Sequence, residues 1–191
     1  MIYLASSSPR RAELLRQIGV EFKLHATHID ESGRPGEDPE EYVLRIATAK
    51  ALSAARELDN CDDRFPVLAA DTTIALDGDI IGKPADLAGC RCILERLSAR
   101  EHLVLTAVVL STPDGLASRL NRSRVRFRPL SATEIQTYCN DGEPLDKAGA
   151  YAIQGRAAIF VEHLEGSYSA VMGLPLFETA ELLREAGLAP L

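Results

Sequence analysis

The stretch that decides the fold is Val67-Leu68-Ala69-Ala70-Asp71-Thr72-Thr73-Ile74-Ala75-Leu76, followed by Asp77-Gly78 and then by Asp79-Ile80-Ile81. Residues 67–76 are rich in apolar and β-branched side chains, which is typical of a strand. An Asp-Gly pair between two such runs indicates a tight turn that folds the chain back on itself. The segment therefore predicts a β-hairpin.

The segments around this hairpin alternate between helix and strand patterns. Helices are predicted over about 9–18, 39–58, 87–97, 132–141 and 175–186, and further strands over 2–5, 102–111, 117–127 and 157–163. Interspersed helices and strands with at least one antiparallel hairpin exclude a purely parallel sheet. We therefore expect an α/β fold with a mixed sheet flanked by helices. The length of 191 residues fits one globular domain, with room for two lobes.

Asp71 is an unexpected residue in the middle of the predicted strand. Aspartate is depleted in strands, and removing a carboxylate from water is costly unless something compensates it. Asp71 must therefore pair with a cation, bind a metal or lie where the sheet opens into a cleft. The alternative is a structural carboxylate bonded to a turn or to an arginine. We favour a functional role, because a site would account for the cost of burying the acid.

The first twenty residues predict an anion site. Residues 2–5 form a short apolar strand, Ser6-Ser7-Ser8 a turn, and Pro9-Arg10-Arg11 the start of a helix that Gly19 closes. Ser8 is a natural N-cap and Pro9 a natural first helical residue. The free N–H groups at a helix N-terminus favour phosphate, and the two arginines add guanidinium forks that match its oxygens. The alternative is that Ser8 only caps the helix and that the arginines are solvated.

Further cations stand at positions that suit a phosphate. Lys50 falls within the apolar face of the helix over 39–58, so its side chain either extends out to solvent or points towards an anion. Lys83 lies between Gly82 and Pro84, so it is either an ordinary exposed turn residue or a cation held at a fixed angle.

Residues 143–155 combine an acid, a lysine, glycines, an aromatic ring and an amide after a predicted helix end. Lys147 suits a phosphate, Tyr151 suits stacking, and Gln154 can present a donor and an acceptor to a base edge. This set of groups is suitable for a nucleotide. The alternative is a glycine-rich connection between a helix and a strand.

The composition excludes several classes of protein. A net charge of −7 argues against broad nucleic-acid binding. No apolar run approaches the roughly 20 residues that span a bilayer, and Met1-Ile2-Tyr3 does not begin a recognisable signal peptide. We therefore expect a cytoplasmic protein that interacts with neither nucleic acid nor membrane.

The cysteines and histidines give no clear metal motif. Cys61, Cys90, Cys92 and Cys139 show no zinc spacing, and we expect reduced thiols, with Cys90 and Cys92 facing different directions on one helix. His25 and His28 form a candidate metal pair, although two histidines in a polar loop are more often bystanders. The sequence contains no P-loop, no GxGxxG and no nucleophile elbow.

Five motifs in order resemble those of the Maf family, which is understood as a family of house-cleaning nucleoside triphosphate pyrophosphatases. They are Leu4-Ala5-Ser6-Ser7-Ser8-Pro9-Arg10-Arg11, Ala69-Ala70-Asp71-Thr72, Gly82-Lys83-Pro84, Asp146-Lys147-Ala148-Gly149 and Val171-Met172-Gly173-Leu174-Pro175. The resemblance runs essentially end to end. It implies an inosine-triphosphatase-like fold over residues 1–191, with an elongated mixed sheet, flanking helices and two lobes around a central cleft, commonly as a homodimer.

Within that family the subgroup acting on dTTP and UTP is the most similar. The resemblance assigns substrate discrimination to Arg11, Thr72 and Gln154, and the sister subgroup associated with 7-methyl-GTP differs at those places. It implies a hydrolase that releases a nucleoside monophosphate and pyrophosphate from canonical or modified pyrimidine nucleotides. Asp71 takes the role of proton acceptor or of metal-assisted activator of water.

The expected site gathers these residues around a triphosphate. In an acidic protein such a ligand calls for a divalent cation, Mg²⁺ or Mn²⁺, for which Glu31 and Asp71 are the candidate ligands. The expected substrate-binding residues are Ser8, Arg10, Arg11, Lys50, Thr72, Lys83, Asp146, Lys147 and Gln154.

Two alternatives remain open at this point. One is a regulatory protein of cell division that binds a nucleotide without turning it over, and the other is the same chemistry with a different base preference. Carboxylates beside a cationic cluster favour the enzyme, because a pure anion-binding site gains nothing from Asp71.

Overall fold

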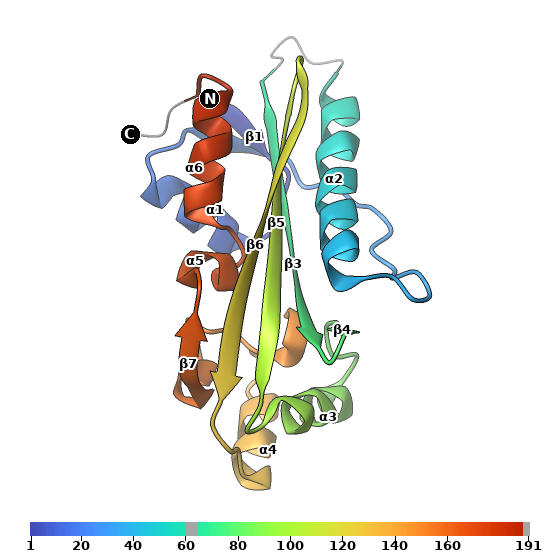
Figure 1. The fold of residues 1–191 in the computed structure, drawn as a ribbon, viewed down its shortest axis with the longest axis vertical. Coiled ribbons are helices and arrows are strands. Elements are labelled where there is room, and N and C mark those ends of the chain that lie inside the picture. Colours follow the sequence, from blue (N-terminus) through green and yellow to red (C-terminus); the bar gives the residue numbers. More distant parts are fainter. Residues whose placement is uncertain (60–64, 189–191) are drawn as a thin grey trace.

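A mixed sheet forms the centre of the molecule (Figure 1). The computed structural model describes residues 1–59 and 65–188. Within these residues seven strands form one sheet in the order β2-β1-β3-β5-β6-β7, and β4 pairs with β3. The strands are β1 (Ile2–Leu4), β2 (Phe22–Leu24), β3 (Val67–Leu76), β4 (Asp79–Ile81), β5 (Glu101–Thr112), β6 (Gly115–Phe127) and β7 (Val161–Glu165).

Helices cover both faces of this sheet. They are α1 (Pro9–Gln17), α2 (Pro39–Leu58), α3 (Leu87–Leu97), α4 (Ala132–Asn140), α5 (Tyr168–Met172) and α6 (Leu176–Glu185), with short 3-10 segments η1 (Ala148–Ala150) and η2 (Arg156–Phe160). Helix α2 lies along one face, α1 and α6 lie on the other, and α3 and α4 pack at the lower end in Figure 1. The predicted α/β class with a mixed sheet is confirmed. No described helix is long and apolar enough to cross a membrane.

The predicted hairpin is present in a mixed sheet, in which β3, β5, β6 and β7 pair antiparallel and the only parallel pairs among the described strands are those of β1. Strands β3 and β4 pair antiparallel, whereas β1 runs parallel to both β2 and β3. In the turn, Asp77 has φ 55° and Gly78 has φ 87°. Positive φ at both central residues is what a type I′ hairpin turn requires, and Asp-Gly supplies it at low cost.

One edge of β3 is interrupted, and this gap positions the site. Strand β1 pairs with Val67 and Leu68, and β4 pairs with residues 74–76 on the same edge. Between them, no strand in the described part of the chain pairs with residues 69–73 on that edge. This edge of β3 is therefore free of strand pairing over residues 69–73, although most of these side chains are buried and only Thr72 is half-buried.

Alternation along β3 sends successive side chains to opposite faces at this gap. Val67, Ala69 and Ala75 pack against the α2 side, whereas Leu68 and Ala70 pack against α1 and α6. Asp71 therefore points towards α2, and Thr72 points towards α1.

Most predicted helix starts are confirmed by their capping contacts. The Asp38 side chain accepts hydrogen bonds from the N–H groups of Glu40 and Glu41, and Ser131 forms a capping box with Glu134. Ser8 stands at the N-cap position of α1, but its side chain caps nothing, and its N–H donates to Ser6 Oγ at 3.1 Å. The expectation that the Ser8 hydroxyl caps this helix was therefore wrong.

The strand predicted over 157–163 begins later than expected. The chain first forms η2, and β7 starts at Val161. Ala157 and Phe160 are both buried, at 0 % and 3 % exposure. In a 3-10 helix, residues three apart lie on the same face, so this turn buries both side chains before the strand begins.

The expectation of reduced thiols is corrected for two cysteines. Cys90 of α3 and Cys139 of α4 form a disulfide across 49 residues. Both lie in one buried cluster where the two helices pack together, and this long-range contact leaves no local sequence pattern. Cys92 is free and exposed, so it does face away from Cys90 as predicted, and Cys61 lies outside the described residues.

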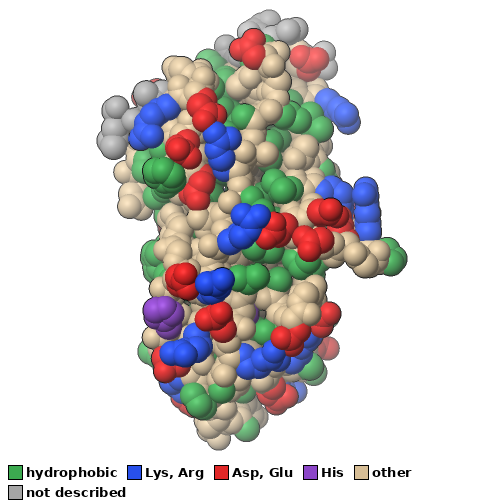
Figure 2. Space-filling view, viewed as in Figure 1, with side chains coloured by type: hydrophobic (Ala, Val, Ile, Leu, Met, Phe, Trp, Pro, Cys, Tyr) green, Lys and Arg blue, Asp and Glu red, His purple; other side chains and the backbone are tan. Residues whose placement is uncertain are grey.

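Charges of both signs are interspersed on the surface. Over the face drawn in Figure 2, Lys and Arg side chains alternate with Asp and Glu, and no large basic patch is visible there. This view agrees with the net charge of −7. Any polyanion must therefore be held by a local group of cations.

Candidate active site

A cleft of about 790 Å³ opens at the gap in the edge of β3. Its lining comes from residues 5–11, residues 71–74 of β3, the turn at 82–83, residues 146–148 and residues 171–173. The cleft brings together ten residues that the sequence proposed for the site: Ser8, Arg10, Arg11, Glu31, Lys50, Asp71, Thr72, Lys83, Asp146 and Lys147. Five of the lining side chains are cationic and three are acidic, so the cleft carries an excess of positive charge within an acidic protein.

Lys50 joins the two candidate carboxylates. Its Nζ donates to Asp71 Oδ1 at 2.8 Å and lies 2.8 Å from Glu31 Oε1. The lysine side chain is 12 % exposed, and Asp71 is 7 % exposed as a residue. Lys50 therefore does not extend to solvent but points towards an anion, and the sequence had left these two possibilities open.

The two carboxylates have pKa values shifted in opposite directions. Burial raises the pKa of Asp71 above its usual value, even though the charges of Lys50 and Arg11 oppose the rise. Partial burial also acts on Glu31, but there the hydrogen bond and charge of Lys50 prevail and lower the pKa. A pair of acids with separated pKa values suits a division of roles, in which one carboxyl exchanges a proton and the other stays ionised.

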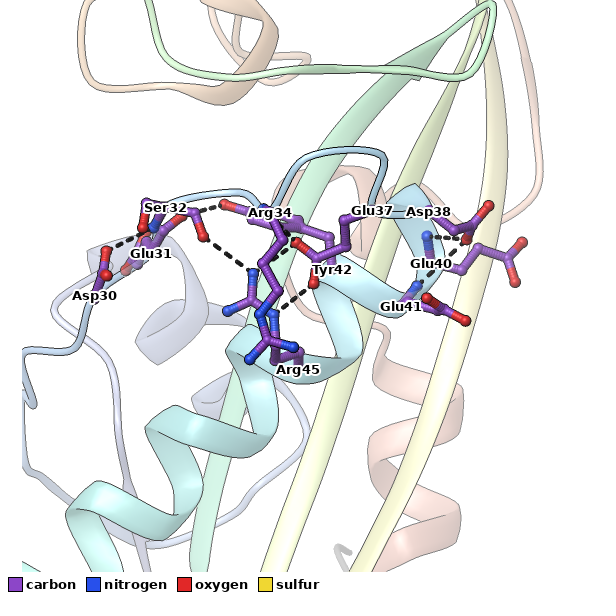
Figure 3. A network of polar contacts seen from close by, with 10 residues as sticks. All are labelled: Asp30, Glu31, Ser32, Arg34, Glu37, Asp38, Glu40, Glu41, Tyr42 and Arg45. Atoms are coloured by element: carbon purple, nitrogen blue, oxygen red, sulfur yellow. Dashed lines mark hydrogen bonds and ion pairs between the residues drawn. The ribbon is translucent and has the colours of Figure 1, made fainter.

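The loop that carries Glu31 is anchored to α2, as Figure 3 shows. Tyr42 Oη donates to the carbonyl of Glu31 at 2.9 Å. Arg45 donates to both oxygens of the Glu37 carboxylate and to the Ser32 carbonyl. These contacts hold the Glu31 side chain near Lys50. Sequence reasoning missed Tyr42 and Arg45, because their partners lie in a loop that has no regular pattern.

Arg11 occupies the opposite side of the cleft and connects three elements. Its Nε donates to the carbonyl of Gly173 at 2.7 Å, and its Nη atoms lie 3.4 Å from Ser6 Oγ and from Thr72 Oγ1. Burial lowers the pKa of Arg11, and the Asp71 charge opposes that change. Thr72 also bonds to Thr106 Oγ1 at 3.1 Å. Arg11 and Thr72, to which the family resemblance assigned substrate discrimination, are thus in direct contact.

The lower side of the cleft carries two lysines on connected loops. Lys147 donates to the Glu143 carbonyl and to the Asp146 carboxylate, each at 2.5 Å. The N–H of Gly149 donates to the carbonyl of Gly82 at 3.0 Å, so the turn with Lys83 and the segment with Lys147 are held together.

Gly149 is the residue on which this connection depends. Its φ is +69°, and a Cβ added there would lie 2.1 Å from Ile74 Cδ1. We expect Gly149→Ala to lower the free energy of unfolding by about 2–4 kcal/mol, because it adds overpacking to backbone strain. Gly142→Ala is the matched control, with φ +81° and nothing within 4 Å. Urea unfolding of both variants measures the difference, and equal losses would show that contact with Ile74 costs nothing.

Three other candidate residues that the sequence raised are Gln154, Tyr151 and His25. Gln154 is exposed and does not line the cleft, so its role in reading a base stays a prediction. Tyr151 lines the cleft but is only 6 % exposed, which leaves little of its ring for stacking. His25 bonds to Glu57 at 2.7 Å, and the described residues contain no group of three or more side chains arranged to hold a metal ion.

Comparison with known proteins places this geometry in context. The sequence profile of the Maf-like protein family matches residues 1–186. The chain is 54% identical to a dTTP/UTP pyrophosphatase of Aromatoleum aromaticum, over 97% of this chain and 95% of that protein. It is 52% identical to a dTTP/UTP pyrophosphatase of Cupriavidus metallidurans, over 98% of each. Among solved structures, the Ham1 protein of Staphylococcus aureus matches with a TM-score of 0.48 at 18% identity, over 66% of this chain and 71% of that one.

Proposed function

Because the chain belongs to the Maf-like protein family, we propose that it hydrolyses dTTP and UTP to the nucleoside monophosphate and pyrophosphate. The observation that carries the proposal is the Asp71–Lys50–Glu31 arrangement at the open edge of β3, inside a cleft with an excess of positive charge. Cations alone would serve an anion-binding site. A buried carboxylate among them gains nothing for anion binding, and a carboxyl group with a shifted pKa in a cleft is typical of a group that takes part in chemistry.

The position of Lys50 shows whether Glu31 and Asp71 fit a divalent cation. Its ammonium group lies 2.8 Å from an oxygen of each carboxylate, so both acids point towards one cationic position. Mg²⁺ is usually bound by one or two carboxylates together with substrate phosphates. The pair therefore fits Mg²⁺ or Mn²⁺ when the triphosphate supplies further oxygens. Bound there, the metal would neutralise phosphate charge and polarise the phosphoryl group.

In the proposed mechanism Asp71 accepts a proton from water. The water oxygen attacks the α-phosphorus, and the bond between this phosphorus and the bridging oxygen breaks, so that pyrophosphate leaves with the electron pair. The raised pKa of Asp71 makes it a stronger base than an exposed aspartate, and Lys50 keeps it ionised. Arg10, Lys83 and Lys147 line the cleft and oppose the charge that develops on the leaving pyrophosphate.

The test is product analysis over a panel of nucleotides. We expect pyrophosphate to be released fastest from dTTP and UTP, more slowly from CTP, ATP, GTP and 7-methyl-GTP, and not at all after chelation of divalent metal. Preference for 7-methyl-GTP would support the sister subgroup instead. Nucleotide binding without any release would support the regulatory binding protein, whose binding need not depend on a metal.

A further inference from the structure

A buried histidine stands directly behind the cleft. His102 of β5 is 2 % exposed and lies among the apolar side chains of the core formed with α3 and α4. Its Nε2 lies 2.9 Å from Tyr151 Oη, and its Nδ1 has no partner among the described residues. Burying a polar side chain in such a core costs free energy, so its single contact requires an explanation.

The hydrogen bond joins Tyr151 to a neutral imidazole. Burial lowers the pKa of His102 to about 4, so the imidazole is neutral at pH 7 and carries one proton. With the proton on Nε2, the Tyr151 O–H has no acceptor among the described residues, and with the proton on Nδ1, that N–H has none. In either tautomer Nε2 and the Tyr151 hydroxyl share one hydrogen bond, which holds the tyrosine in place.

Tyr151 connects His102 to the cleft, because it contacts the histidine and also lines the cleft. The centroid of its ring lies 4.8 Å from that of Phe127 and 5.5 Å from that of His102, and both pairs pack edge to face. The alternation along β5 places Val104 on the same face as His102, and Ile74 pairs with Val104 across the two strands. Tyr151, Val104 and Ile74 all line the cleft. They form an uncharged wall at the floor of the cleft, which only their edges reach, because the three residues are 6 %, 2 % and 3 % exposed. Asp71 lies on the other face of β3.

We propose that His102 is a positioning residue for the nucleotide, which fixes Tyr151 so that the exposed edge of its ring, together with Val104 and Ile74, meets the base at the floor of the cleft. The inference rests on the proposed function, because it assigns the apolar part of a nucleotide to this wall. Phosphates need the cations on the rest of the lining, whereas a base gains most from an uncharged, rigid surface. A free tyrosine would have to be ordered each time a nucleotide binds, and the bond from His102 removes that cost.

The test measures the dissociation constant for α,β-methylene-dTTP by calorimetry, which does not depend on turnover. We expect His102→Leu to weaken binding about fivefold to tenfold, as the loss of one hydrogen bond predicts. His102→Gln keeps both a donor and an acceptor for the Tyr151 hydroxyl and should restore most of the affinity. Tyr151→Phe should weaken binding by a similar factor, and the double variant should be no weaker than either single one.

The control separates positioning from stability. Val125 is fully buried in the same core and pairs with His102 across β5 and β6. The substitution Val125→Ala leaves a cavity there without touching the His102–Tyr151 hydrogen bond. It should lower the melting temperature and leave the affinity unchanged. In turnover, His102→Leu should raise KM for dTTP with kcat within about twofold of the wild type.

Three results would overturn the inference: unchanged affinity in a folded His102→Leu variant, failure of His102→Gln to restore it, or losses that add in the double variant. These outcomes are distinct from failure of the proposed function. A wild-type protein that binds the analogue but releases no pyrophosphate from dTTP contradicts the hydrolase and leaves the role of His102 measurable. A wild-type protein that binds no nucleotide contradicts both.

Discussion

Asp71→Asn should lower the turnover of dTTP by about 10²-fold to 10⁴-fold while the protein stays folded. Removal of a positioned general base costs about this much, because water must then lose its proton without help. Asparagine has the same shape, and Lys50 keeps its contact with Glu31. Pyrophosphate release under saturating Mg²⁺ measures the effect, with a circular dichroism spectrum to confirm the fold.

Asp77→Asn is the matched control for this substitution. Asp77 lies in the turn that follows the same strand, and its exposed carboxylate pairs with Arg100 outside the cleft. Its variant should turn over dTTP at nearly the wild-type rate. Wild-type turnover in Asp71→Asn, or equal losses in both variants, would remove Asp71 from the mechanism.

Lys50→Met should produce the second large effect, a loss of turnover on the order of 10²-fold at pH 7, since removal of one electrostatic partner at a reacting centre has this cost. The substitution removes both the charge and the hydrogen bond that lower the pKa of Asp71 against the effect of burial. The pKa of Asp71 must therefore rise further. The base acts in its ionised form, so activity is lost as pH falls through that pKa.

The measurement is the pH dependence of kcat/KM, which reports the ionisation of the free enzyme. In the wild type the ascending limb should lie above the range of an exposed aspartate, because burial raises the pKa of Asp71. In Lys50→Met the limb should move to higher pH, so that the loss of activity becomes smaller in alkaline solution. Lys50→Arg keeps the charge and should move the limb less. A limb at an unchanged position in Lys50→Met would contradict the coupling of these two side chains.

Local features of this fold could be predicted from the sequence because they depend on neighbouring residues. The Asp77-Gly78 turn, the cap at Asp38 and the capping box at Ser131 each involve groups within a few positions, and all three are present. The antiparallel hairpin also excludes a purely parallel sheet. Asp71 could be singled out because an acid inside an apolar strand conflicts with the pattern around it.

Long-range contacts could not be predicted in the same way. The disulfide joins Cys90 to Cys139, the anchor of the Glu31 loop depends on Tyr42 and Arg45, and His102 meets Tyr151 across 49 positions. Each contact arises because tertiary packing brings distant segments together, so the residues involved look ordinary in sequence. Ser8 shows the converse case, since it has the right local propensity for a cap and stands at the N-cap position, yet its side chain makes no capping hydrogen bond and its N–H donates to Ser6 Oγ.

The candidate site combines both kinds of information. Local motifs predicted most of the residues that the cleft brings together, whereas only the fold shows how they are divided. Asp71, Lys50 and Glu31 meet on the α2 side of β3, and Thr72 meets Arg11 on the other. This division follows from the alternation of one strand at a gap in its edge, and it separates the reacting acid from the residues associated with substrate discrimination.

The most direct test of the proposed chemistry follows the oxygen atom that water contributes. The protein would hydrolyse dTTP in oxygen-18-enriched water with Mg²⁺, and mass spectrometry would locate the label in the products. Attack at the α-phosphorus predicts one labelled oxygen in dTMP and unlabelled pyrophosphate. Label in pyrophosphate, or release of labelled inorganic phosphate, would contradict the proposed site of attack and with it the alignment of Asp71 on the α-phosphoryl group.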